Sequence, residues 1–250
     1  MMKKRLDQLL IDRGFTKTRS RAQALIMAGL VFSEGRCLNK AGLILDEKII
    51  IELRGKDHQW VSRGGLKLIK AIETFNIDPT GFTVIDVGSS TGGFTDVLIK
   101  HGATKIYAVD VGYGQLAWKL RNDPRVIVLE RTNARYLSTK LITEPVDMVV
   151  CDASFISIEV ILPAALSLTK SQAWLIALIK PQFEVGKGYV SKYGLVRDSK
   201  LHIEVCERID RWLSNFLNWT VLGIIESPII GHRGNKEFLI AGQKLVNSTI

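Results

Sequence analysis

Apolar residues change their spacing near residue 60, and the two patterns predict two domains. Before that point they recur at helical spacing over Leu6–Leu10 and Ala22–Ile26, with Gly14 and Gly29 as natural helix ends. Strand-like pieces with a turn at 34–36 follow, at residues 30–32 and 48–53. We therefore expect residues 1–60 to form a small α+β domain, with two short helices before a bent sheet.

From residue 83 the apolar residues form near-continuous runs of strand length, separated mostly by helix-length segments. Such runs are typical of parallel strands buried on both faces of a sheet. Seven occur, at 83–87, 106–111, 126–129, 147–152, 174–179, 220–225 and 237–241. A loop rather than a helix joins the last two, so we expect the last strand to be antiparallel and at the edge. The pattern predicts a Rossmann-like, doubly wound α/β domain over residues 61–250.

The first strand-to-helix turn of this domain has the composition of a ligand-binding loop. Its three glycines, Gly88, Gly92 and Gly93, allow the backbone to approach a ligand closely. The second strand ends in Asp110, whose carboxylate is placed to hold the hydroxyls of a ribose. The domain should therefore bind an adenosine-containing ligand. The spacing Gly-x-x-x-Gly-Gly differs from the Gly-x-Gly-x-x-Gly of dinucleotide sites, which disfavours a dehydrogenase.

The net charge of +9 is concentrated at the N-terminus, where residues 1–24 hold seven Lys or Arg against two acids. Positive charge gathered on one small domain favours a polyanionic partner, either nucleic acid or an anionic membrane. A merely solvated basic face is the competing interpretation. The candidate residues of this segment for binding such a polyanion are Lys4, Arg5, Lys17, Arg19 and Arg21.

The composition excludes several other classes of protein. No apolar run has the length of a transmembrane helix, and the basic N-terminus lacks the apolar stretch of a secretory signal. The three cysteines lie far apart and fit neither a disulfide framework nor a zinc site. We therefore expect a cytoplasmic protein that uses no metal and has no evident obligate protein partner.

Two polar residues at strand ends are candidates for catalysis. Asp152 ends the fourth predicted strand and Lys180 ends the fifth, so both should lie at the carboxyl edge of the sheet with the glycine loop. An isolated Lys or Asp at a strand end is usually only solvated. Lys67 and Glu237 can be placed at the same edge only through a family resemblance.

That resemblance covers nearly the whole chain. Arg5-Leu-Asp-Gln-Leu-Leu, Thr18-Arg-Ser-Arg-Ala-Gln-Ala-Leu-Ile and Gly29-Leu-Val-Phe resemble the S4 RNA-binding domain. Asp86-x-Gly88-x-x-x-Gly92-Gly93 resembles motif I of class I methyltransferases. Lys67, Asp152, Lys180 and Glu237 resemble the Lys-Asp-Lys-Glu tetrad of FtsJ-like ribose 2′-O-methyltransferases. With Ser62-Arg-Gly-Gly-Leu-Lys-Leu, Cys151-Asp-Ala-Ser-Phe, Ile179-Lys-Pro-Gln-Phe-Glu and Gly234-Asn-Lys-Glu-Phe-Leu, the chain resembles the TlyA family, whose members are often labelled hemolysins.

The resemblance implies S-adenosylmethionine as cofactor and a cytidine 2′-hydroxyl of ribosomal RNA, free or in a ribosomal subunit, as substrate. It implies that the methionine part lies against Asp86, Gly88, Ser90, Gly92 and Gly93. Asp110 would take the ribose hydroxyls, Asn133 would meet the adenine edge, and Val111 would only pack. The family pattern has arginine at the position of His58, which puts the role of that linker residue in doubt.

The tetrad suggests a division of roles. We expect Lys180 to act as general base, with the neighbouring cation Lys67 and partial burial favouring its neutral form. Asp152 would orient the amine, and Glu237 would hold Lys67 or the ribose. Residues 184–198, rich in glycine and basic side chains, are expected to form a flap or an ordinary surface loop.

Two further functions remain open: a membrane-active cytolysin, and an RNA-binding assembly factor with an inactive site. No long basic amphipathic helix supports the cytolysin. The filled tetrad argues against the inactive factor.

Overall fold

The structure is a computed structural model that describes residues 3–27, 29–54, 59–216, 218–231 and 234–246. His58 lies outside these residues. The chain divides into two compact units, Met1–Arg63 and Gly64–Ile250, so the division lies three residues after the predicted boundary. No helix in the described ranges is long and apolar enough to cross a membrane.

The N-terminal unit contains the two predicted helices, packed on two small sheets. Strand β1 pairs antiparallel with β4, and β2 lies between β3 and β5. Its elements are β1 Lys3–Arg5, α1 Leu6–Asp12, α2 Arg19–Met27, β2 Val31–Ser33, β3 Arg36–Cys37, β4 Ile44–Asp46 and β5 Glu52–Leu53. Its core is formed by apolar residues of both helices with Val31 and Ile51.

The predicted strand at 48–53 is shorter than expected, because its first half is a turn. Asp46 accepts hydrogen bonds from the backbone of Lys48 at its side chain and of Ile49 at its carbonyl. Only Glu52–Leu53 pairs with β2. The pairing of β1 with β4 was missed, because three-residue strands carry little periodicity.

The C-terminal unit is a seven-stranded sheet in the order β11-β12-β10-β9-β6-β7-β8. All pairs from β10 to β8 are parallel, as predicted. Its elements are α3 Gly64–Phe75, β6 Thr83–Val87, α4 Gly93–Lys100, β7 Lys105–Val109, α5 Trp118–Arg121, β8 Val126–Leu129, η1 Ala134–Tyr136, β9 Val146–Cys151, α6 Ile158–Ser167, β10 Thr169–Ile179, α7 Pro181–Glu184, η2 Lys187–Tyr189, α8 Ser199–Ser214, β11 Trp219–Glu226 and β12 Phe238–Lys244.

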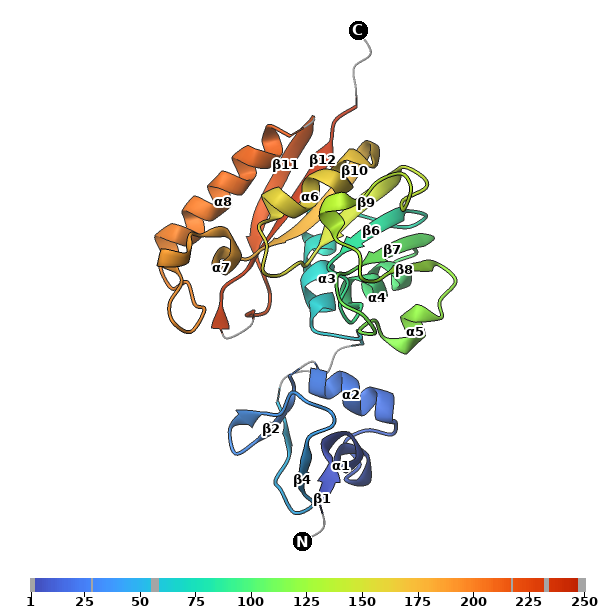
Figure 1. The fold of residues 1–250 in the computed structure, drawn as a ribbon, viewed down its shortest axis with the longest axis vertical. Coiled ribbons are helices and arrows are strands. Elements are labelled where there is room, and N and C mark those ends of the chain that lie inside the picture. The colour runs from blue at the N-terminus through green and yellow to red at the C-terminus, as the bar shows by residue number, and fades with distance from the viewer. Residues whose placement is uncertain (1–2, 28, 55–58, 217, 232–233, 247–250) are drawn as a thin grey trace. The chain divides into compact units, whose positions relative to one another are not determined.

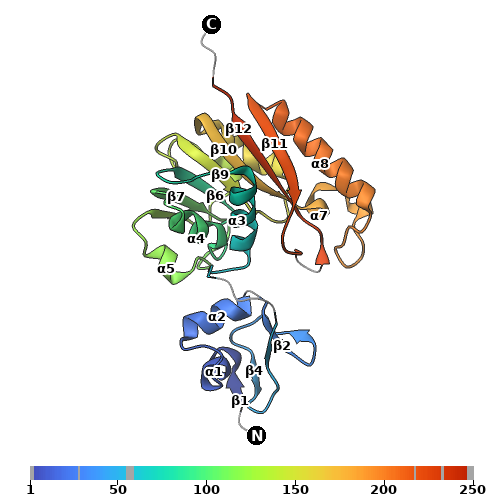
Figure 2. The same ribbon diagram turned by 180° about the vertical axis from the view of Figure 1, so that it is seen from behind.

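The last strand is antiparallel as predicted, but its position at the edge was wrong. β12 pairs antiparallel with both β10 and β11, so it fills the space between them and β11 forms the edge. Helices α6 and α8 pack over one face of the sheet, while α3 and α4 lie over the other, as Figures 1 and 2 show. Because β12 is antiparallel to β10, its N-terminal end lies at the carboxyl edge of the parallel strands.

Candidate active site

Four ionisable side chains form a continuous series of contacts at the carboxyl edge of the sheet. Lys67 Nζ, in the first turns of α3, lies 2.8 Å from Glu237 Oε2 and 3.3 Å from Asp152 Oδ2. Asp152 Oδ1 lies 2.7 Å from Lys180 Nζ. Both lysines and Glu237 are buried, although lysine is rarely buried without a partner. The structure thus places all four residues of the predicted tetrad together.

The charges within this group support one another. Burial disfavours the charged amine of Lys67, but the carboxylates of Asp152 and Glu237 outweigh it and raise the pKa of Lys67. Burial likewise opposes the charge of Asp152, yet the two lysine amines lower the pKa of that carboxyl. At neutral pH the site therefore holds a charged Lys67 beside an ionised Asp152.

Lys180 contacts more groups than the Asp152 side chain that the sequence predicts as its partner. Its amine forms an ion pair with Asp152 Oδ1 at 2.7 Å, and it donates to the Asp152 carbonyl oxygen at 3.1 Å and to Ser154 Oγ at 2.8 Å. Ser154 was missed, and its only signal was its position two residues after Asp152. We expected repulsion from Lys67 to favour the neutral form of Lys180. The Asp152 carboxylate lies between the two amines, 3.3 Å from Lys67 Nζ and 2.7 Å from Lys180 Nζ, and the expectation stays a prediction.

Local backbone features hold these side chains in place. Pro181 follows Lys180 and begins α7, so β10 ends at this point. Gly231 lies directly against the carboxyl group of Glu237, and a Cβ atom there would be 2.1 Å from Glu237 Oε1. A side chain at 231 would therefore force the carboxyl group of Glu237, which contacts Lys67, to shift.

The glycine loop has the close packing expected of a cofactor cradle. Gly88 has φ +78°, and a Cβ atom there would lie 2.9 Å from the backbone of Ala153. At Gly92, with φ +93°, it would lie 2.3 Å from Leu120 Cδ1. Gly93 begins α4, so this loop leads directly into a helix N-terminus. Ser90 also adopts a positive φ of 47°.

Asp86 lies at the end of β6 with an unused hydrogen-bond acceptor. It is fully buried, its Oδ2 accepts from Thr95 Oγ1 at 2.6 Å, and its Oδ1 has no partner among the described residues. Burial raises the pKa of Asp86 to about 7, with a further rise from the nearby carboxylates of Asp152 and Asp110. An unpartnered carboxylate oxygen beside a glycine cradle fits a bound group that carries hydrogen-bond donors.

Asp110 follows β7 and connects two loops. Its Oδ2 accepts from the backbone N–H of Ser90 and its Oδ1 from that of Gly112, both at 2.7 Å. Asn133 follows β8 and accepts from the backbone N–H of Arg135, so it caps η1. Val111 was expected to be a packing residue, but it is 71% exposed beside Asp110. An exposed apolar side chain at this edge could pack on a ligand instead.

These residues together fit S-adenosylmethionine. The glycine cradle and Asp86 suit its polar methionine part, while Asp110 and the exposed Val111 suit a ribose and a flat base. No group of three or more acidic, His or Cys side chains in the described part of the chain could hold a metal ion.

The predicted RNA-binding residues of the N-terminal unit are partly engaged within the fold. Asp7 is fully buried, and Arg5 and Arg19 donate to it at 2.9–3.0 Å. The hydrogen bonds from Arg5 hold the pKa of Asp7 well below its usual range. Lys4 pairs with Asp12 at 2.9 Å.

The other predicted residues differ in exposure. Lys17 is exposed, whereas the side chain of Arg21 is half-buried. The backbone N–H of Arg21 donates to Thr18 Oγ1 at 3.2 Å, which identifies Thr18 as a cap of α2. Arg13, which was not proposed, donates to the carbonyl oxygens of Glu47 and Ile49.

The predicted flap at 184–198 is bound at both ends. Glu184 is buried at its start, and Val196 is buried near its end. Asn235 accepts from the backbone N–H of Val196 at 3.1 Å and donates to the Gly194 carbonyl at 2.8 Å. Any flap motion therefore concerns the residues between these anchors.

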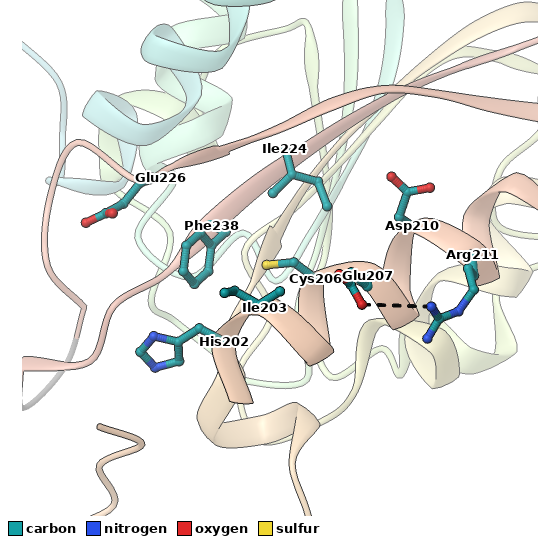
Figure 3. A pocket seen from close by; sticks show the side chains of 9 residues that line it. All are labelled: His202, Ile203, Cys206, Glu207, Asp210, Arg211, Ile224, Glu226 and Phe238. Atoms are coloured by element: carbon teal, nitrogen blue, oxygen red, sulfur yellow. Dashed lines mark ion pairs between the residues drawn. The ribbon is translucent and has the colours of Figure 1, made fainter. Parts of the chain in front are cut away.

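A cavity of about 520 Å³ lies between α8 and the strands β11 and β12 (Figure 3). Its apolar floor includes the ring of Phe238, which contacts His202 edge-on with ring centroids 5.7 Å apart. No tetrad residue lines it, so it is separate from the proposed catalytic group. The lining residues are His202, Ile203, Cys206, Glu207, Asp210, Arg211, Ile224, Glu226 and Phe238.

Comparison with known proteins agrees with this architecture. Residues 60–244 match the FtsJ-like methyltransferase family, and residues 4–48 match the S4 domain. The chain is 44% identical over 237 residues to the 16S/23S rRNA (cytidine-2′-O)-methyltransferase TlyA of Mycobacterium tuberculosis, covering 94% of this chain and 88% of that protein. It is 40% identical over 239 residues to Hemolysin A of Brachyspira hyodysenteriae, covering 94% and 98% respectively.

A solved structure of a Streptococcus thermophilus protein is similar over the whole chain. It has a TM-score of 0.76 and 40% sequence identity, and the match covers 98% of this chain and 90% of that one. The chain therefore belongs to the TlyA family, in which an S4 domain precedes an FtsJ-like methyltransferase domain, and it is an S-adenosylmethionine-dependent methyltransferase.

Proposed function

We propose that this protein methylates the 2′-hydroxyl of a cytidine in ribosomal RNA. The observation that carries the proposal is the contact of Asp152 with both Lys67 and Lys180 at the edge that holds the cofactor loop. The choice of cytidine and ribosomal RNA is supported by the substrate named for the M. tuberculosis relative. The S4 domain, with the exposed Lys17, supports an RNA partner.

The residues have distinct tasks in this scheme. When bound, S-adenosylmethionine supplies an electrophilic methyl group, and Asp86, Ser90 and Asp110 would hold it with the glycine loop. A ribose hydroxyl is a poor nucleophile until its proton is removed. Lys180, as the neutral amine in the reacting complex, takes that proton as the oxygen attacks. Much of the rate acceleration comes from holding two bound reactants in line.

The remaining tetrad members position Lys180 and the ribose. Asp152 holds the Lys180 amine through Oδ1 and through its own carbonyl oxygen. Lys67 binds the other oxygen of Asp152, and Glu237 holds Lys67 in turn. The scheme requires no metal ion.

The test uses 2′-O-methyl mapping in ribosomal RNA, with purified protein and tritiated cofactor on ribosomal subunits. The wild type should add a methyl group at a cytidine, while Lys180→Ala should lose turnover with cofactor affinity close to wild type. Lys180→Arg should be nearly as inactive, because a guanidinium does not release its proton near neutral pH. Thermal melting checks that both variants are folded.

Three outcomes would contradict parts of the proposal. Absence of any ribose methyl group in the presence of wild-type protein would refute the function. Methylation of a base atom would refute the ribose hydroxyl as acceptor. Substantial turnover by Lys180→Arg would refute Lys180 as base.

A further inference from the structure

Glu184 is a buried carboxylate outside the tetrad that contacts two other elements. Its side chain is 1% exposed. Its Oε2 accepts from Ser157 Oγ at 2.7 Å and from Arg208 Nη2 at 2.8 Å, and its Oε1 accepts from the backbone N–H of Ile158 at 2.9 Å. Burial raises the pKa of Glu184, and these three donors oppose the rise. A buried carboxylate with this many donors is held in one position.

The two segments that it joins carry tetrad residues. Residues 152–158 leave β9 and lead into α6, and residues 180–184 leave β10 and form α7. At the end next to the sheet, the two segments are linked by Lys180 and Asp152. At the far end they are linked by Glu184, which binds the beginning of α6. Residues 152–158 and 180–184, the two exit segments, are thus joined to each other at both of their ends.

Short-range geometry makes this loop stiff. Phe183 donates its backbone N–H to the carbonyl of Lys180 at 2.8 Å, and Val185 donates to that of Pro181 at 3.0 Å. Phe155 has φ +67°, a conformation that non-glycine residues keep only where the surroundings hold them. Its ring lies against that of Phe183, with centroids 4.9 Å apart. Glu184 thus lies one helical turn after Lys180, in a short helix whose backbone hydrogen bonds include the Lys180 carbonyl.

We propose that Glu184, held by Arg208 of α8, is a positioning residue that keeps the Lys180 amine aligned with Asp152. The inference rests on the proposed function of the tetrad. Glu184 touches none of the reacting groups, so its effect passes through the two exit segments. Arg208 reinforces the link by also donating to the Glu184 carbonyl oxygen at 3.1 Å.

The test compares Glu184→Gln with Glu159→Gln as matched control. Glu159 lies in the first turn of α6 and, like Glu184, pairs with Arg208, at 3.7 Å. It does not belong to the segment that follows β10. Below the melting temperatures of both variants, Glu184→Gln should lower kcat at least tenfold and change the pH–rate profile, with KM for the cofactor within twofold. Glu159→Gln should match the wild type in all three.

A second measurement does not depend on turnover. Nitrogen-15 spectra of lysine ammonium groups, assigned with Lys67→Arg and Lys180→Arg, should show a displaced Lys180 signal in Glu184→Gln and an unchanged one in Glu159→Gln. If Glu184→Gln does not fold, Ser157→Ala removes one of the three bonds and should displace the same signal.

The outcomes separate the two proposals. A wild type that adds no methyl group refutes the proposed function, while the spectra still decide the positioning role. An active wild type with wild-type kcat in folded Glu184→Gln overturns the inference, as does an unchanged Lys180 signal. A stability loss with unchanged kcat per folded molecule would show a structural role only and would also overturn it.

Discussion

Replacing Asp86 with asparagine should stabilise the ligand-free protein at alkaline pH. Asp86 is fully buried, and one of its oxygens has no partner among the described residues. Burial, with nearby carboxylates adding to it, raises its pKa from 3.8 to about 7. Ionising Asp86 in the folded state is therefore unfavourable, whereas the amide side chain of the Asp86→Asn variant carries no charge at any pH.

Raising the pKa of Asp86 from 3.8 to about 7 corresponds to about 4 kcal/mol, at about 1.4 kcal/mol for each tenfold change in the ionisation constant. Because the folded-state pKa of this acid is raised, the penalty is absent below pH 3.8, grows between pH 3.8 and 7, and is complete above 7. Between pH 5 and pH 8.5 the stability of Asp86→Asn relative to wild type should rise by about 2.5 kcal/mol.

Urea unfolding at pH 5 and pH 8.5, without cofactor, measures this difference. Tryptophan fluorescence reports mainly on the C-terminal unit, which holds four of the five tryptophans. Asp78→Asn is the control, because hydrogen bonds from Thr80 lower the pKa of the exposed Asp78. Its pH dependence should be small and opposite in sign. An Asp86→Asn advantage that is equal at both pH values would refute the burial argument.

Four other substitutions test the cofactor site, the tetrad and the RNA surface. Asp110→Ala should weaken S-adenosylmethionine binding by roughly 30- to 100-fold, as for lost hydrogen bonds to a charged group, and unchanged affinity in calorimetry would remove Asp110 from the site. Gly231→Ala would place a methyl group 2.1 Å from Glu237 Oε1 and should lower turnover at least tenfold with cofactor affinity retained; wild-type turnover would show that Glu237 can move without loss. Lys17→Ala should reduce the salt dependence of RNA binding by about one phosphate contact, whereas Arg19→Ala should also lower the melting temperature, because Arg19 binds a buried carboxylate. An unchanged slope for the Lys17 variant would exclude it from the RNA interface.

Several features of the site were predictable because they depend on local sequence. The strands at Thr83–Val87 and Val126–Leu129 have the predicted bounds, and the other five predicted strands of the sheet overlap the observed ones, with ends that differ by up to five residues. Parallel strands end at a common edge, so the proximity of Asp152 and Lys180 followed from their positions after neighbouring apolar runs. The same reasoning placed Asp110 beside the glycine loop, where it accepts from Ser90.

Other features have no local signal. The placement of β12 between β10 and β11 depends on hydrogen bonding with both neighbours, which hydrophobic periodicity does not encode. The burial of Asp7 beneath two arginines was likewise not predictable from the sequence, because an aspartate in a basic segment has the pattern of a surface residue.

The sequence by itself determined to within a few residues where the strands of the large sheet lie, which loop has the composition of a ligand-binding turn, and which polar residues stand at strand ends, because burial and turn geometry leave a periodic pattern along the chain. Lys67 and Glu237 could be assigned only by family resemblance, since one lies in a helix before the sheet and the other in the last loop. Tertiary structure decided that they meet Asp152, that Asp152 separates the two lysines, and that Glu184 joins both exit segments. Each of these contacts joins charged or polar groups from different segments of the chain, and its energy depends on distance and desolvation in the folded protein.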